Sequence, residues 1–225
     1  MKLSKYGIDL ILLQEEDIEL VRQWRNHPSV VSNFEYREYI TPEMQRKWFK
    51  TINNFNNLYF IVQYKGKKIG VVNAKNIDCE KRTCESGIFF PEGKYSKTFI
   101  PAIVVIMTME FGFRLFGAYK GYARVLKTNK PVQNMIRSTG YEPCDGQENV
   151  ENQLYEITQG KFLKKAGKLL RAMYTVTGDK EGMTLTIFRE DFNNEIVMKW
   201  EEIGKKYANV LRIEEGEEGR IYYLK

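Results

Sequence analysis

Histidine and cysteine are scarce in this sequence of 225 residues, which contains one histidine and three cysteines. Cys79, Cys84 and Cys144 cannot all pair within one chain, and none of them has metal-ligand spacing with the histidine. We therefore expect no disulfide framework and no metal centre. An odd number of thiols without such a pattern favours a reducing cytoplasm as the compartment.

Long apolar runs are also missing. The longest extends from Phe99 to Met109 and is shorter than the about 18–20 residues that span a bilayer, and the first residues lack a secretory pattern. The net charge of +6, from 35 basic and 29 acidic residues, favours anionic ligands. Because this excess is small and dispersed, we expect neither a membrane nor a nucleic acid as the partner.

The overall composition is ordinary for a globular protein, with 43% hydrophobic and 28% charged residues. The length fits one large domain, or one domain with an appendage. We expect residues 1–190 to form the main domain and residues 191–225 to form a C-terminal helix and hairpin packed on it. The reason is an apolar stripe that needs cover, formed by Ile196, Trp200, Ile203 and Tyr207.

Hydrophobic periodicity and turn residues predict the order of the elements. A first strand turns into a helix between Asp9 and Pro28, and a second helix begins with Thr41 as its N-cap. Three antiparallel strands follow, with Gly66 in the turn of the first hairpin. The later elements are expected as a helix over 101–115, a strand over 119–126, a helix ended by Gly140, a strand over 153–157, a basic amphipathic helix, a strand over 183–188, and a closing helix and hairpin.

Four stretches carry a resemblance to a known family: "WRNHPSV" (24–30), "IGVVNAKNID" (69–78), "ESGIFF" (85–90) and "NKPVQNMIRSTGY" (129–141). Together with the element order, they make residues 7–190 resemble the GNAT family of acetyl-CoA-dependent N-acetyltransferases. The resemblance implies an α/β (α+β) fold with a mixed, mostly antiparallel central sheet, flanked by helices and splayed beside residues 84–90. It also implies acetyl-CoA as co-substrate, with its pantetheine arm along the splayed strand.

Within that family, two branches are resembled by "WRNHPSV", "ITPEMQRKWF" (40–49), "IGVVNAKNID" and "ESGIFF". One branch acetylates the N-termini of ribosomal proteins, as at alanine, and the other acetylates amino groups on nucleotide-linked sugars, as in pseudaminic acid synthesis. The pattern "IG-x-x-x-x-x-NID" at residues 69–78 favours the sugar branch.

The loop before the helix that begins at Pro101 is the expected phosphate loop. At the positions of the family signature Q/R-x-x-G-x-G/A it carries Tyr95, Thr98 and Ile100. N–H groups before a helix and two lysines remain, so the loop either binds coenzyme A in an altered conformation or belongs to a fold kept for another purpose. The resemblance implies cofactor contacts by Ile88, Phe89, Phe90, Lys94, Ser96, Lys97, Thr98, Phe99, Ile100, Ala102 and Asn129.

Acetyl transfer to an amine needs a base and stabilisation of an oxyanion. Glu85 is the only carboxylate on the splayed strand and is the predicted base, with a solvated residue paired to a lysine as the alternative. The resemblance places the oxyanion contact at a backbone N–H near Phe89 and Phe90. Ile136 stands where many relatives carry a tyrosine that protonates the thiolate.

The end of the first helix is where the family builds its acceptor pocket. We expect Arg25, Asn26 and His27 to bind the acceptor there, because an arginine fork suits a phosphate or a carboxylate. Glu35, in the loop that follows, is expected to bind the acceptor amine. The alternatives are a helix-end role for His27 and a turn around Glu35.

The sequence thus predicts an acetyl-CoA-dependent N-acetyltransferase that acts on a primary amine of a small molecule or of a nucleotide-linked amino sugar. The alternatives are acetylation of a protein N-terminus and a non-catalytic GNAT-like binding protein. The resemblance also makes a homodimer an expected assembly, without choosing its surface.

Overall fold

The strands of this protein form one sheet. The structure is a computed structural model that describes residues 1–178 and 182–224, except the side chains of Ala166 and Lys168. The 11-stranded sheet has the order β10-β11-β9-β1-β2-β3-β4-β5-β6-β8-β7. Its strands are β1 Lys2–Lys5, β2 Ile8–Leu12, β3 Leu58–Tyr64, β4 Lys67–Asp78, β5 Thr83–Phe89, β6 Lys120–Leu126, β7 Glu142–Pro143, β8 Asn152–Thr158, β9 Met183–Phe188, β10 Val210–Gly216 and β11 Gly219–Leu224.

Helices cover both faces of this sheet. They are α1 Ile18–Asn26, α2 Pro28–Val31, α3 Pro42–Ile52, α4 Gly93–Ser96, α5 Ile100–Glu110, α6 Lys130–Thr139, α7 Gln159–Thr177 and α8 Glu195–Tyr207. Short 3-10 turns lie at Glu15–Asp17 and Arg189–Asn193, and a π-helical turn, Phe111–Leu115, extends α5. Within the described residues, none of these helices is long and apolar enough to cross a membrane.

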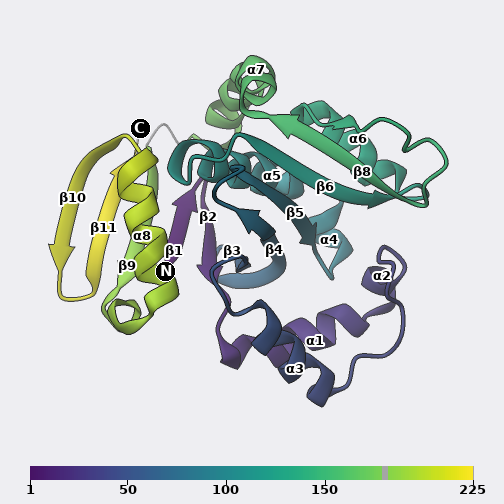
Figure 1. Cartoon of the computed structure of the whole chain (residues 1–225), viewed down its shortest axis with the longest axis horizontal. Helices are drawn as coiled ribbons and strands as arrows, with labels where there is room; N and C mark the ends of the chain where they lie inside the picture. Colours follow the sequence, from purple (N-terminus) through teal and green to yellow (C-terminus); the bar gives the residue numbers. More distant parts are fainter. Residues whose placement is uncertain (179–181, 225) are drawn as a thin grey trace.

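The two faces of the sheet bury separate cores. The smaller core joins α1 and α3 to one face and is centred on Leu13, Val21, Ile61 and Val71. The larger core takes apolar side chains from α5, α6, α7 and α8 on the other face. Figure 1 shows α1 and α3 on one side of the molecule and α6 and α7 on the opposite side. The expected fold, a mostly antiparallel sheet flanked by helices, is confirmed.

The sheet splays at one place. Every neighbouring pair of strands is antiparallel except β5 and β6, which are parallel. Their pairing ends at Ser86 with Ala123, although β5 continues to Phe89 and β6 to Leu126. We call these diverging ends, residues 87–89 and 124–126, the splay. The predicted splay beside residues 84–90 is thereby confirmed.

The N-terminus contains a strand that the sequence patterns missed. β1 and β2 form a hairpin whose turn residues Tyr6 and Gly7 have positive φ of 57° and 72°. An aromatic residue is unusual in such a turn, and a strand of only four residues carries little periodicity. The expectation of a single strand before the first helix was therefore wrong.

The C-terminal helix and hairpin contact the rest of the chain. β11 pairs with β9, which in turn pairs with β1, so the hairpin continues the main sheet. Trp200 of α8 is 2% exposed, and its ring lies 4.7 Å from that of Phe55 and 4.9 Å from that of Phe116. Tyr207, at the end of the predicted stripe, is 39% exposed. The division between a main domain and an appendage at residue 190 stays a prediction.

We expect Trp200→Ala to lower the free energy of unfolding by about 3–5 kcal/mol, because it removes a buried aromatic side chain between two other rings. Urea denaturation followed by circular dichroism measures this change. Leu211→Ala is the control, since Leu211 is 64% exposed on the outermost strand and should change stability by less than about 0.5 kcal/mol. Equal midpoints for the two variants would contradict the role given to α8.

Candidate active site

The splay lies where two helices begin. β5 leads through α4 into α5, and β6 leads into α6, so both crossovers start at the diverging strand ends. Asn129 is the N-cap of α6, and its side-chain oxygen accepts a hydrogen bond from the Val132 N–H at 3.3 Å. A helix N-terminus carries partial positive charge, so this end of the sheet favours an anionic group.

Polar residues form a surface beside the splay on the face that α1 and α3 cover. Tyr59, Asn73 and Gly87 are register partners across β3, β4 and β5. They lie on that face because Val71, two residues before Asn73, belongs to the smaller core. The next row holds Lys75 and Glu85. With Arg124 of β6, we call these residues the floor of the site.

Glu85, the predicted base, is held between two cations. Its side chain is 13% exposed and forms ion pairs with Lys75 at 2.9 Å and with Arg124 at 3.5 Å. The geometry therefore supports a role in holding the two cations on the floor, and the assignment of Glu85 as base stays a prediction.

Arg25 presents a guanidinium group that makes no hydrogen bond or ion pair with the described residues. It stacks on the ring of Phe34 at 3.5 Å, and the ring of Phe89 lies 6.0 Å away. Among the described residues, no carboxylate or carbonyl group accepts a hydrogen bond from it. Burial lowers the pKa of this guanidinium, although Tyr59 nearby acts in the opposite sense. A half-buried arginine with five free N–H donors is a candidate contact for an anionic group.

The predicted phosphate loop contains a short helix, α4. The N–H groups of Tyr95 and Ser96 donate to the Glu92 carbonyl, and those of Lys97 and Thr98 donate to the carbonyls of Gly93 and Tyr95. The Thr98 hydroxyl also donates to the Tyr95 carbonyl at 2.7 Å and accepts from the Ile100 N–H at 3.2 Å. N–H groups that a phosphate loop presents to its ligand are thus directed into the loop itself.

The two lysines of this loop differ in whether they form an ion pair. Lys94 is ion-paired with Glu92. Lys97 is exposed and has no ion-pair partner among the described residues. Ser96 and Phe99 are also exposed, and Phe99 is 50% exposed. Lys97 is therefore the side chain of this segment that is most available to a phosphate.

The other predicted cofactor residues divide between the splay and the core. Phe89 lies against Phe34, with an edge-to-face ring distance of 5.6 Å. Phe90 and Ile100 are buried in the larger core, and Ile88 packs against it. Ala102 is half-buried in the first turn of α5. Among these side chains, Phe89 is the one that lies on the face of the sheet that α1 and α3 cover.

A segment that we call the strap, residues 28–35, crosses from one side of the splay to the other. The Ser29 hydroxyl donates to the Pro91 carbonyl at 2.9 Å, after β5. Asn129 donates to the side chain of Asn33 at 3.1 Å, after β6. Glu35 accepts a hydrogen bond from Asn152 at 3.0 Å, at the start of β8. Of the predicted site residues, Glu35 belongs to the strap and Asn129 contacts it through Asn33.

The side chains of Asn26 and His27 form hydrogen bonds with nearby backbone groups. The Asn26 amide donates to the Ile40 carbonyl at 2.9 Å and accepts from the Ile40 N–H at 2.8 Å. His27 is the N-cap of α2, where its Nδ1 accepts from the Ser29 N–H at 3.3 Å. The geometry favours the helix-end role for His27, and a direct contact of either residue with an acceptor would require these bonds to break.

The sequence analysis did not single out four residues of the floor: Tyr59, Asn73, Lys75 and Arg124. A partial signal was present, because Asn73 lies between the apolar residues Val72 and Ala74 on a predicted strand. Which of these positions face one another depends on the register of four strands, and the sequence does not reveal that register. Ile136, at the position of the expected tyrosine, is buried and offers no proton.

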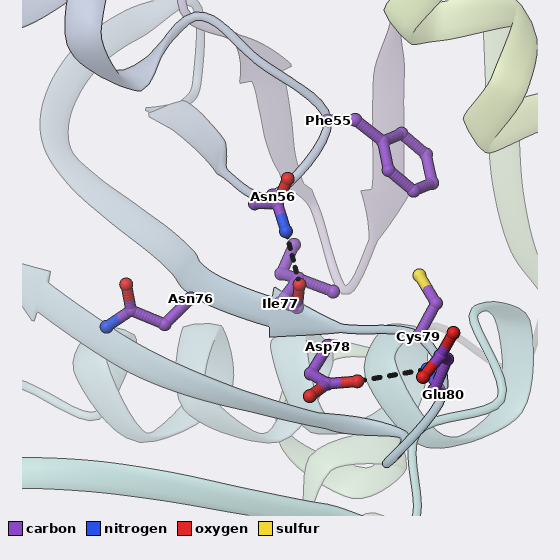
Figure 2. Close-up of a pocket in the computed structure, with 7 residues that line it drawn as sticks. All are labelled: Phe55, Asn56, Asn76, Ile77, Asp78, Cys79 and Glu80. Atoms are coloured by element: carbon purple, nitrogen blue, oxygen red, sulfur yellow. Dashed lines mark hydrogen bonds between the residues drawn. The ribbon is translucent and has the colours of Figure 1, made fainter.

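A separate surface hollow of about 490 Å³ lies at the far end of β4. Figure 2 shows that it is lined by the loop before β3 and by the end of β4 with the turn that follows, and the Asn56 amide joins the two by donating to the Ile77 carbonyl at 2.9 Å. Asp78 accepts from the Glu80 N–H at 3.0 Å and so closes the turn to β5. This hollow is a surface depression between two chain segments that contact each other. Within the described residues, no group of histidine, cysteine or acidic side chains is placed to hold a metal.

Comparison with known proteins identifies the family. The family model for the acetyltransferase (GNAT) domain matches residues 8–142, more than half of the chain. This chain belongs to the GNAT acetyltransferase family. The predicted family and the enzyme class, N-acetyltransferase, are thereby confirmed.

Two curated acetyltransferases are similar to parts of this chain. Spermidine N(1)-acetyltransferase of Escherichia coli strain K12 is 28% identical over 140 residues, which are 61% of this chain and 74% of that protein. Acetyltransferase PseH of Campylobacter jejuni is 32% identical over 78 residues, 34% of this chain and 48% of that protein.

Solved structures show the same fold. FdhC, described as a nucleotide-linked sugar GNAT, has a TM-score of 0.64 at 21% identity, covering 76% of this chain and 97% of its own. A spermidine N-acetyltransferase from Vibrio cholerae, in complex with CoA and spermine, has a TM-score of 0.63 at 18% identity, covering 71% of this chain and 99% of its own.

We expect Glu85→Gln to lower kcat by less than about tenfold and to leave the shape of the pH–rate profile unchanged, because the carboxylate is paired rather than poised to take a proton. Glu156→Gln is the matched control, since it removes the partner of Lys120 at 3.0 Å, farther across the sheet. A loss of about 100-fold or more together with the disappearance of an acidic limb would confirm Glu85 as the general base.

Proposed function

We propose that this protein transfers the acetyl group of acetyl-CoA to the primary amine of a small acceptor that carries an anionic group, such as a nucleotide-linked amino sugar. The amine nitrogen attacks the thioester carbonyl carbon, a C–N bond forms and the C–S bond breaks. The sulfur leaves with the bonding electron pair as the coenzyme A thiolate. The amine loses one proton, and the products are the N-acetyl amide and coenzyme A.

The splay is the observation that supports acetyl transfer. The ends of β5 and β6 present backbone edges to each other without pairing, and an extended amide chain can satisfy such edges. The pantetheine arm of acetyl-CoA is a chain of that kind. Members of the GNAT family use acetyl-CoA, and the residues of the splay fit this co-substrate.

The phosphates of the co-substrate need a different set of contacts from the usual loop. The N–H groups of residues 95–98 and of Ile100 donate within the loop. We propose that the pyrophosphate lies over residues 94–102 and is held chiefly by Lys97, with Lys94 and the exposed Ser96 nearby. Unwinding of the single turn of α4 would release further N–H donors for the same group.

The charge of the floor supports an anionic acceptor. Arg25, Lys75 and Arg124 lie beside the splay, where the carboxylate of Glu85 pairs with Lys75 and Arg124. A polyamine such as spermidine carries several positive charges and would be repelled by this surface. A diphosphate or carboxylate would instead supply the acceptor that the Arg25 guanidinium lacks. We therefore favour the acceptor class of the nucleotide-sugar relatives over that of the spermidine relatives.

Two other functions are separated by direct measurement. A non-catalytic binding role is favoured by the inward-facing N–H groups of α4 and by Ile136, and it predicts no acetyl transfer to any amine. Acetylation of a protein N-terminus predicts transfer to an alanine-initiated peptide. We propose a panel of UDP-glucosamine, spermidine and such a peptide, with acetylated products measured by mass spectrometry. UDP-glucosamine as the preferred acceptor supports our proposal, and a preference for spermidine would overturn it.

The cell compartment and the assembly also belong to this proposal. The three cysteines are free thiols, in keeping with the expected cytoplasm. The expected homodimer stays a prediction.

We expect Lys97→Ala to weaken acetyl-CoA binding by about 1–2 kcal/mol, which is roughly 5- to 30-fold in Kd, because a charge-assisted hydrogen bond to phosphate is lost. Isothermal titration calorimetry measures this change. Lys94→Ala is the matched control and should have a smaller effect, since Lys94 is ion-paired with Glu92. An unchanged Kd for Lys97→Ala would place the phosphates elsewhere, and wild-type protein that binds no acetyl-CoA would support the non-catalytic alternative.

A further inference from the structure

One buried polar atom beside the splay has no partner. The side-chain oxygen Oδ1 of Asn73 is buried and accepts no hydrogen bond. Buried side-chain oxygens in folded proteins are nearly always hydrogen-bonded, because an unpaired one loses its hydration without compensation. The other atoms of this kind in the described residues lie in α3, α8 and β11 and belong to Gln45, Trp200, Glu201 and Arg220.

The position of Asn73 connects this atom to the site of acetyl transfer. Asn73 pairs with Gly87, the first residue of β5 beyond the last pair with β6. A Cβ placed on Gly87 would lie 3.2 Å from Nδ2 and 3.3 Å from Oδ1 of Asn73. The Asn73 amide therefore lies against the backbone of the splayed strand. Because Gly87 has no side chain, that backbone is open on the face that α1 and α3 cover.

The neighbours of Asn73 leave its oxygen without a protein donor. Tyr59, on the other side of Asn73 in the same row, stacks edge-to-face on Trp48 at 5.3 Å. Lys75, two residues along the strand, is committed to Glu85 at 2.9 Å. The carboxylate of Glu85 is thus occupied by cations, whereas the carbonyl oxygen of Asn73 has no donor among the described residues, and a rotation of this half-buried side chain would present it to a donor from outside the chain.

We propose that the side-chain oxygen of Asn73 binds the acceptor amine by accepting a hydrogen bond from one of its N–H groups. This inference rests on the proposed function and names the group that positions the nucleophile. A neutral primary amine has two N–H groups and one lone pair. One N–H on Asn73 leaves the lone pair free to attack the thioester carbonyl beside Gly87.

In this arrangement Asn73 holds the amine and takes no proton from it. The C–N bond forms with the nitrogen lone pair, the C–S bond breaks, and the electron pair leaves on sulfur. The proton lost by nitrogen passes to solvent or to the thiolate. Asn73 is therefore a substrate-contact residue, distinct from a general base.

Two near-isosteric substitutions test this role. Asn73→Leu removes the acceptor atom and keeps the size of the side chain, whereas Asn73→Asp keeps an acceptor oxygen and removes the NH₂ group. We expect Asn73→Leu to lower kcat/KM for the amine by about 10- to 100-fold, since a misplaced nucleophile costs up to this much. We expect Asn73→Asp to stay within about tenfold of wild type.

The controls separate this role from a structural one. Gln63→Leu removes another amide side chain, on β3, at a position that pairs with Lys68 away from the splay. It should leave kcat/KM unchanged. The Kd for acetyl-CoA should stay unchanged in all three variants. The melting temperature of Asn73→Leu should equal or exceed that of wild type, because the substitution removes a buried atom that has no partner.

The outcomes distinguish this inference from the function on which it rests. The amines are UDP-glucosamine, spermidine, the alanine-initiated peptide and glycinamide, a small amine without an anionic group. If wild-type protein acetylates none of them, the proposed function fails and the inference fails with it. If wild type is active and Asn73→Leu matches it, the inference alone is overturned. An equal loss in Asn73→Leu and Asn73→Asp, with unchanged melting temperatures, would also overturn it, because the NH₂ group would then be the functional one.

Discussion

The end of hydrogen bonding between β5 and β6 after Ser86 and Ala123 is the constraint on which the rest of the site depends. Backbone groups that part inside a sheet need another partner, because leaving them unpaired costs free energy. The parallel direction of these two strands also requires a crossover connection, and α4 and α5 lie within it. The starts of α5 and α6 therefore come to the same edge as the open backbone. A slot for an extended chain and a region of positive potential arise from one feature of the sheet.

The strap connects the acceptor side of the site to this feature. It contacts the chain after β5 through Ser29 and the chain after β6 through Asn33. Each such hydrogen bond contributes only about 0.5–1.5 kcal/mol net, so the position of the strap depends on several weak contacts together. Phe34, which it carries, supports the guanidinium of Arg25. The placement of the predicted anion contact thus depends on the same strand ends that open the slot.

The sequence predicted those parts of this arrangement that local chemistry determines. Gly66 marked the β3–β4 hairpin and Gly140 marked the end of α6, because turns and caps depend on single residues. The helical turn of α4 was not predicted, since four residues carry no periodicity. The contacts of Asn73 could not be read from the sequence either. They depend on the register of three strands and on the absence of a side chain at Gly87.

The cations of the floor bear on the chemistry as well as on the acceptor's identity. A primary amine attacks only in its neutral form, and nearby positive charges disfavour the ammonium form. Arg25, Lys75 and Arg124 lie beside the splay, so an amine bound between them would meet positive charge that favours its neutral form. A site of this kind has less need of a strong base, because the amine arrives with fewer protons. The paired state of Glu85 is consistent with that requirement, because an unpaired carboxylate there would stabilise the unreactive ammonium form.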